Sequence, residues 1–188
     1  MANTSPANEK QSAIVLRDVR KHYGAVHAVD GVDLKIPQGQ VFGLIGHNGA
    51  GKSTLFKMML GLERPTSGHI TVAGADVAGP NFRAARRKLG YLPENVVLYD
   101  NLSGLETLNF FARLKGASLQ ECPSLLDKVG LSHAGKRAVR EYSKGMRQRL
   151  GFAQALLGKP EVLFWMSQPM VWIRKQFVIF ISPCASYS

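Results

Sequence analysis

The sequence predicts an α/β fold, and three features of the chain support that prediction. A glycine-rich loop at residues 46–54 follows a short apolar run at residues 41–45. Helix-forming residues then occupy positions 54–60. Further apolar runs and helical segments alternate along the rest of the chain. Strands interleaved with helices, with a glycine loop between one strand and one helix, are typical of α/β domains.

The loop reads Gly-His-Asn-Gly-Ala-Gly-Lys-Ser-Thr, which has the spacing G-x-x-x-x-G-K-[ST] of a phosphate-binding loop. Its glycines let the backbone turn tightly and point N–H groups at phosphate oxygens. We expect Lys52 to reach the β- and γ-phosphates of a nucleoside triphosphate, and the Ser53 hydroxyl to ligate Mg²⁺. The alternative, a chance glycine turn, leaves the Lys-Ser pair unexplained. The residues predicted to contact the nucleotide here are Gly46, His47, Asn48, Gly49, Ala50, Gly51, Lys52, Ser53 and Thr54.

The remaining elements fit one domain, since 188 residues can bury a sizeable core. Residues 1–12 are predicted to be a flexible arm. Asp30 and Gly31 are expected to form a turn that separates the first two predicted strands. Ser103 opens a helix with a capping box, and Ser143 can cap a later one. The predicted strands are residues 14–16, 32–36, 69–72 and 161–164, and the predicted helices are residues 82–88, 103–115, 124–129 and 143–157.

Composition restricts the class of protein. The formal net charge is +11, which is compatible with nucleic acid or an anionic membrane surface as a partner. A solvated basic surface is the simpler interpretation, because no nucleic-acid motif appears, and we predict no nucleic-acid partner. The polar N-terminus and the lack of long apolar runs favour a cytoplasmic protein. Cys122 and Cys184 have no metal-binding spacing and indicate no disulfide framework.

The stretch Glu-Tyr-Ser-Lys-Gly-Met-Arg-Gln-Arg-Leu, residues 141–150, resembles the signature motif L-S-G-G-Q of ABC-transporter ATPases. Ser143 and Gly145 match that motif, whereas the other three motif positions differ. The resemblance implies that Ser143 faces the γ-phosphate of ATP bound by a second copy, so that two chains sandwich two nucleotides. A serine at a helix N-terminus suits that role. Taken alone, the same residues also fit an ordinary capped amphipathic helix.

Two other positions gain a role from this resemblance. Tyr23 lies upstream of the loop, where the family carries an aromatic residue that stacks on adenine; a core tyrosine is the alternative. Glu94, within residues 89–95, occupies the place of the glutamine of the Q-loop. A carboxylate there can reach Mg²⁺ or its water, and a surface glutamate is the alternative. The resemblance therefore adds Tyr23, Glu94, Ser143 and Gly145 to the predicted ATP and Mg²⁺ site.

The resemblance covers residues 13–164, with a helical subdomain at about 95–158. Residues 46–53, 90–95, 111–117, 142–150 and 153–158 are similar to one subfamily, the ATP-binding subunit of the copper-processing transporter used in nitrous oxide reductase maturation. This implies an ATPase that forms a homodimer and works with an ABC-transporter membrane subunit. It would lie at the inner face of the cytoplasmic membrane.

The family's Walker B strand should end in Asp-Glu, which hold Mg²⁺ and the attacking water. That strand begins at residues 161–164, but residues 165–188 contain no acidic residue. Codons for residues 164–174, read one base out of frame, accommodate Leu-Asp-Glu-Pro-Thr-Asn-Gly-Leu-Asp-Pro. Single-codon Trp and Met force several of these residues. We therefore expect residues 165–188 to be an out-of-frame tail, apolar and prone to aggregation, on an ATPase impaired in catalysis.

Three other functions are also compatible with the sequence. The chain can be a nucleotide-binding fragment that does not hydrolyse ATP, or an ABC ATPase for another substrate. It can also be an ATPase of the DNA-repair type. Strong, salt-dependent DNA binding would be needed to support the last of these.

Overall fold

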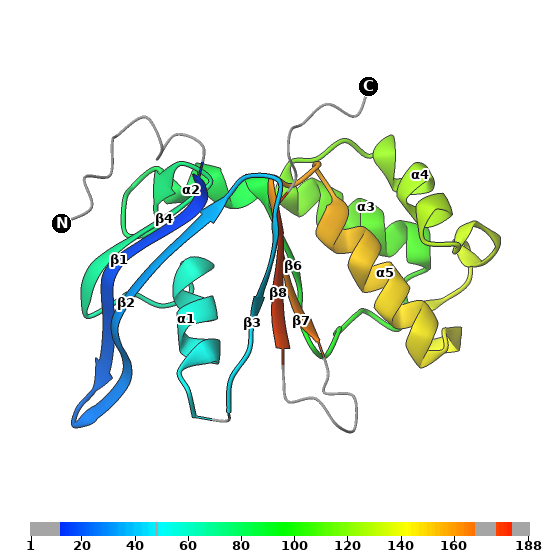
Figure 1. Cartoon of the computed structure of the whole chain (residues 1–188). Helices are drawn as coiled ribbons and strands as arrows, with labels where there is room; N and C mark the ends of the chain where they lie inside the picture. Colours follow the sequence, from blue (N-terminus) through cyan, green and yellow to red (C-terminus); the bar gives the residue numbers. More distant parts are fainter. Residues whose placement is uncertain (1–11, 48, 168–175, 182–188) are drawn as a thin grey trace.

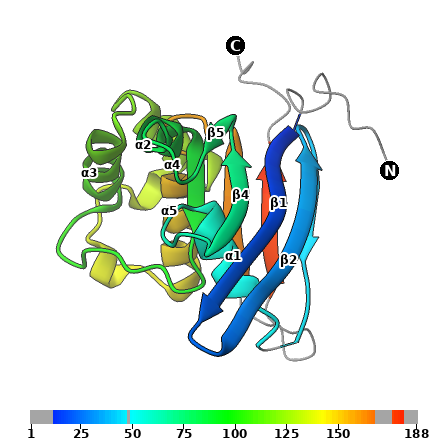
Figure 2. The same cartoon turned by 90° about the vertical axis from the view of Figure 1, so that its left-hand side faces the viewer.

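The computed structural model describes residues 12–47, 49–167 and 176–181, and Figure 1 shows a sheet-rich half joined to a helical half. One sheet is antiparallel, with the strand order β2-β1-β4-β5. Figure 2 shows its long β1–β2 hairpin beside β4. The strands of this sheet are β1 (Ser12–Tyr23), β2 (Val26–Pro37), β4 (Ser67–Val72) and β5 (Ala75–Asp76).

The second sheet contains the strand that leads into the phosphate loop, and its strand order is β3-β8-β7-β6. Strands β6 and β7 are parallel, whereas β8 runs antiparallel to both β3 and β7 and lies between them. Among the described strands, β3 therefore joins this sheet through β8. The strands are β3 (Val41–Leu44), β6 (Leu89–Leu92), β7 (Val162–Ser167) and β8 (Gln176–Ile181).

The helices divide between the two halves. In Figure 1, α1 lies between the two sheets, and α3, α4 and α5 gather on the other side of the second sheet. The helices are α1 (Lys52–Met59), α2 (Phe82–Ala85), α3 (Gly104–Lys115), α4 (Glu121–Lys128) and α5 (Lys144–Leu156). Short 3₁₀ turns span residues 86–88, 132–134 and 139–141. None of the described helices is long and apolar enough to cross a membrane.

Each half has its own hydrophobic core. In the sheet-rich half, the Phe56 ring on α1 meets the Phe164 ring on β7 edge to face, with centroids 5.1 Å apart. In the helical half, Leu108, Leu131 and Leu150 are fully buried together. A small cluster that includes Leu92 of β6 lies where α5 meets the second sheet. Burial of apolar surface thus holds each half together and attaches the helices to the sheet.

Several predicted boundaries were wrong. The expected break at Asp30 and Gly31 does not occur, because β2 continues through both residues. Register shifts along the β1–β2 pairing and a φ of +65° at Gly31 accommodate them, as in a β-bulge. Strands β5, β6 and β8 were not predicted. Helix α4 begins at Glu121, ahead of the predicted start, since Pro123 is tolerated in a first turn.

The two ends of the chain are described in part. Of the predicted arm at residues 1–12, residues 1–11 lie outside the described residues, and Ser12 begins β1. Of the segment predicted to be an out-of-frame tail, residues 165–167 complete β7 and residues 176–181 form β8. Residues 168–175 and 182–188 lie outside the described residues.

Candidate nucleotide site

The phosphate loop connects β3 to α1 at the lower edge of the molecule in Figure 1. Gly49 and Gly51 have φ values of 85° and 71°, in the left-handed region that favours glycine. The Leu55 N–H donates to the Gly51 carbonyl oxygen at 2.9 Å, so the helix begins directly after the loop. Asn48, which was predicted to contact the nucleotide, lies outside the described residues. Strand, loop and helix follow one another as the motif requires.

Lys52 is almost fully enclosed, although it is a lysine at the start of a helix. Its side chain is 8% exposed, and its Nζ donates to the carbonyl oxygens of Gly46 at 2.6 Å and His47 at 2.5 Å. A side chain on Gly46 would begin 3.6 Å from the Lys52 Cδ atom. The loop therefore holds one positive charge against its own backbone, in the position from which an ammonium pairs with phosphate oxygens.

Gly51 fixes the loop against the neighbouring hairpin. A Cβ atom at this position would lie 2.0 Å from the carbonyl oxygen of Ala28 on β2, which no side chain permits. The close approach and the positive φ together require glycine here. An eight-residue helix that starts at Lys52 adds its N-terminal partial charge to the ammonium. These residues fit a bound polyphosphate.

Ser53 and Thr54 occupy the first turn of α1. Ser53 is exposed, so its hydroxyl can contribute one ligand to Mg²⁺ held mainly by nucleotide phosphates and water. Thr54 is half-buried, and its side chain interacts with the Tyr23 hydroxyl. Ala50 is exposed, and its N–H donates to the His47 carbonyl at 3.3 Å. Strand β7, whose sequence is Val-Leu-Phe-Trp-Met-Ser, supplies no carboxylate to this site.

Tyr23 lies beside the helix that follows the phosphate loop. Its side chain is 47% exposed at the end of β1, and its hydroxyl donates to Glu63 Oε1 at 2.5 Å. This hydrogen bond is the main cause that raises the pKa of Tyr23 and lowers the pKa of Glu63. The Lys21 ammonium lies 5.0 Å from the ring centroid and 3.2 Å from Glu63. The ring is therefore held in place near Thr54, and about half of its surface remains exposed.

Glu94 follows β6 and is half-buried. Its backbone carbonyl accepts a hydrogen bond from Gln148 Nε2 of α5 at 3.3 Å. This contact joins the segment predicted as the Q-loop to the helix that carries the signature residues. The contact goes through the backbone, so it does not depend on the difference between a glutamate and a glutamine side chain.

Ser143 begins α5 and is exposed. Its Oγ accepts a hydrogen bond from the Met146 N–H at 3.2 Å, as an N-cap does. Gly145 is exposed in the first turn of the helix. In Figure 1 the N-terminal end of α5 lies at the far side of the helical half from the phosphate loop. The structure therefore does not bring Ser143 and Gly145 together with the loop of the same chain.

Three functional contacts were not predicted from the sequence, namely those of Glu63, Ala28 and Gln148. Glu63 binds Tyr23 across 40 residues of sequence, and Ala28 contributes only a carbonyl oxygen. Gln148 lies in the signature stretch, but its contact with residue 94 depends on tertiary packing. No local pattern predicts such contacts, because each joins residues that lie far apart in the sequence.

A model of the family described as "ABC transporter" matches residues 29–165, most of the chain. The chain belongs to the ABC transporter family of ATP-binding proteins. Similar proteins include an uncharacterized ABC transporter ATP-binding protein of Nostoc, which is 41% identical over 85% of this chain and 50% of its own length. The daunorubicin resistance ATP-binding protein DrrA3 of Streptomyces coeruleorubidus is 39% identical over 81% of this chain and 49% of its own length. The lantibiotic transport ATP-binding protein SrtF of Streptococcus pyogenes is 39% identical over 79% of this chain and 63% of its own length.

A comparison with solved structures agrees with this family assignment. A solved ATP-binding subunit of an ABC transporter superposes with a TM-score of 0.70 at 31% identity, covering 82% of this ABC chain and 65% of the solved one. This confirms the predicted α/β fold of the ABC type. The chain spans about half the length of the first two relatives named above.

Proposed function

We propose that this ABC chain binds MgATP at the phosphate loop and transmits binding to a membrane partner, as part of a transporter's ATP-binding subunit. The enclosed Lys52 and the contact of Gly51 with Ala28 carry this proposal, because they form a compact phosphate cradle. Tyr23 supplies a flat surface for adenine beside the same helix. The chain's membership in the ABC transporter family supports a membrane partner and a place at the inner face of the cytoplasmic membrane.

The test is calorimetric titration of the chain with MgATP. Lys52→Ala should weaken binding at least about a hundredfold, since it removes the charge that faces the β- and γ-phosphates. Lys57→Ala is the matched control: Lys57 is exposed in the last turn of the same helix, and its removal should leave affinity within about twofold. Equal affinities for the two variants would reject the site.

We propose that two copies pair head to tail around two ATP molecules. The separation of α5 from the loop of its own chain supports this arrangement, because Ser143 can then serve only another chain's nucleotide. Sedimentation velocity with and without MgATP tests the proposal. ATP-dependent dimers that disappear in Lys52→Ala are expected, and a chain that stays monomeric at saturating MgATP would contradict it.

The cargo class is a finer proposal. The stretches at residues 46–53, 90–95, 111–117, 142–150 and 153–158 support copper processing for nitrous oxide reductase maturation. The names of two relatives instead concern daunorubicin resistance and lantibiotic transport, which makes drug or peptide export the second candidate. Deleting the gene distinguishes them: loss of copper from nitrous oxide reductase supports the first, and raised sensitivity to a drug or peptide antibiotic supports the second.

We infer that this chain hydrolyses ATP negligibly, because residues 165–188 contain no Asp or Glu to place Mg²⁺ and the attacking water. Reading the nucleotides at the Phe164 codon and inserting one base should restore Leu-Asp-Glu-Pro-Thr. Phosphate release should then rise far above that of the printed chain. If the unaltered chain hydrolyses ATP at the full rate and Lys52→Ala abolishes that activity, another residue places Mg²⁺ and water. That result would count against both the impairment and the frameshift.

A further inference from the structure

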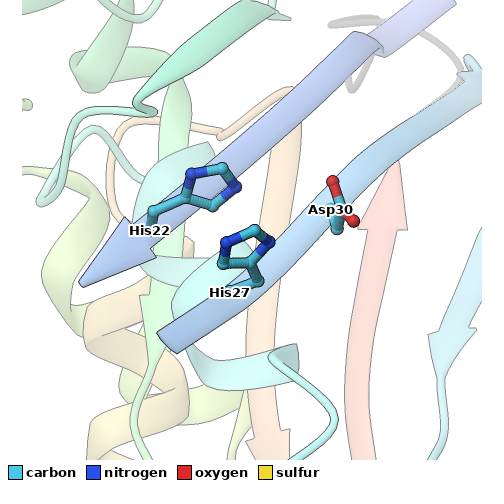
Figure 3. Close-up of side chains that lie close together, drawn as sticks. All are labelled: His22, His27 and Asp30. Atoms are coloured by element: carbon cyan, nitrogen blue, oxygen red, sulfur yellow. The ribbon is translucent and has the colours of Figure 1, made fainter. Parts of the chain in front are cut away.

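We propose that His22, His27 and Asp30 form a binding site for a divalent transition metal ion on the β1–β2 hairpin, independent of ATP. One ligand atom from each of the three residues lies within 4.8 Å of the others. His22 on β1 pairs directly with His27 on β2 in the antiparallel register, so both side chains project from the same face. Figure 3 shows the two imidazole rings face to face, with Asp30 beside them on β2.

The histidine pair has an unsatisfied nitrogen. The ring centroids are 3.9 Å apart and the rings are nearly parallel, at 15°. The His22 Nε2 atom is buried and has no hydrogen-bond partner among the described residues. A buried polar atom without a partner costs free energy, and a ring nitrogen is a common metal ligand. A metal ion bound there would satisfy this nitrogen. The main chain is held as well, because the His22 N–H donates to Thr66 Oγ1 at 3.0 Å.

Asp30 is oriented by a neighbouring ion pair. Arg20 donates to Asp30 Oδ1 and, at 2.8 Å, to Asp18 Oδ1. One guanidinium therefore lies between two carboxylates, and the group keeps a net negative charge. A carboxylate has about four acceptor sites, so the bond to Arg20 leaves capacity for a metal. Hydrogen bonds to a ligating carboxylate are the usual outer support of a metal site.

The donor set decides the class of metal. Two imidazoles and one carboxylate suit Zn²⁺, Cu²⁺ or Ni²⁺, whereas Mg²⁺ and Ca²⁺ prefer oxygen ligands. Zinc–nitrogen bonds of about 2.0–2.1 Å in tetrahedral geometry place two ligand nitrogens about 3.3 Å apart. His27 is exposed, so a small rotation of its ring can bring the donors to that spacing. Three protein ligands leave a fourth position for water, as in an exchangeable site.

The site lies on the part of the hairpin that touches the nucleotide site. Tyr23 follows His22 in the chain, and Ala28 follows His27. The pairing register shifts between Lys21 and His22, so that one extra residue of β2 is accommodated between His27 and Val29, and His27 and Asp30 can share a face although they lie three residues apart. A bound ion would therefore link β1 to β2 where Ala28 supports Gly51.

The experiment is a calorimetric titration of the metal-stripped chain with Zn²⁺ in the absence of nucleotide. Saturable binding of one ion per chain is expected, and His27→Ala should weaken it by about tenfold or more. The control is His69→Ala, because His69 is an exposed histidine with the Asp76 carboxylate at 4.0 Å and no third ligand among the residues that the structure describes. That variant should bind like the parent chain.

A second pair of variants separates ligation from the ion pair. Asp30→Asn removes the negative charge of a proposed ligand that also pairs with Arg20, whereas Asp18→Asn removes only the charge of an Arg20 partner. Asp30→Asn should weaken Zn²⁺ binding clearly more than Asp18→Asn. Co²⁺ in place of Zn²⁺ gives a visible spectrum that reports nitrogen ligands, and His27→Ala should change it. Absence of saturable binding, or equal affinities for His27→Ala and His69→Ala, would overturn the proposal.

Discussion

The phosphate loop and the start of α5 are the two helix N-termini to which we assign a phosphate, and they are built differently. At the loop, Lys52 is enclosed and Gly51 touches the backbone of β2, so the surroundings fix every contact. At α5, Ser143 and Gly145 are exposed. The Ser143 hydroxyl caps the helix through the Met146 N–H, and its carbonyl oxygen accepts from the Arg147 N–H at 2.9 Å. Contacts with β2 therefore fix the loop from outside its own helix, whereas the hydrogen bonds described for Ser143 all lie within α5.

This difference bears on how far each of the two regions departs from its sequence motif. The loop matches its motif at every defined position, because backbone geometry, charge and packing all restrict the residues there. The signature stretch departs from its motif at three positions, and two of them are packed in the helical half. Tyr142 is buried and donates its hydroxyl to the Ala134 carbonyl oxygen, and Met146 packs against the same core, whereas Lys144 is exposed. Variants of each region should therefore affect different measurements.

The largest effect is expected for Gly51→Ala. The new Cβ atom would collide with the Ala28 carbonyl oxygen, and φ is +71°, so we expect a loss of roughly 3 kcal/mol or more in the free energy of unfolding, with loss of ATP binding. Urea unfolding and calorimetry measure both. Gly49→Ala is the control, because open space surrounds that position and only a backbone cost of about 1 kcal/mol remains. Similar costs for both would remove the assigned role of Ala28.

Next is Tyr23→Ala, which should weaken MgATP binding by about 1–3 kcal/mol if the ring stacks on adenine. Tyr23→Phe keeps the ring and loses only the contacts of the hydroxyl with Glu63 and Thr54, so its affinity should stay close to that of the parent chain. Comparing both variants with ATP and with inorganic triphosphate isolates the base. Equal weakening for ATP and triphosphate would mean that Tyr23 supports the loop through Thr54 rather than binding adenine.

A smaller effect on stability, about 1 kcal/mol, is expected for Ser143→Ala through loss of the N-cap. Ser103→Ala removes a similar cap from α3 and serves as the matched variant. Both should unfold at slightly lower urea concentration. Only Ser143→Ala should also reduce the MgATP-dependent dimer in sedimentation. If Ser103→Ala reduces the dimer as much, Ser143 is an ordinary cap.

The smallest effect concerns Lys115 at the end of α3. Burial lowers the pKa of Lys115 to about 8, and its Nζ donates to the Leu157 carbonyl at 2.5 Å. Because the folded pKa lies below the unfolded one, the unfolded chain binds more protons between the two values, and stability should rise as the pH goes from about 8 to 10. Relative to Lys115→Met, the parent chain should gain roughly 1 kcal/mol in urea unfolding. A flat difference over this range would contradict the burial of the ammonium.

The sequence was sufficient to predict the fold and the loop because both depend on local patterns. The loop is one continuous motif, and strand and helix periods around it are clear. The path of β2 through Asp30 and Gly31 was missed, since a bulge lets turn residues stay within a strand. The hydrogen bond between Tyr23 and Glu63 depends on the tertiary fold, so no local pattern could indicate it.

The position of β8 has a mechanical consequence. In the described residues, the pairing of β3 with its sheet runs through β8 alone, and β7 carries the connection onward to the helical half. A chain cut before residue 176 would leave the phosphate-loop strand with no hydrogen-bonded neighbour in that sheet. The strand that lies between β3 and β7 therefore sets the distance between the phosphate loop and the helical half.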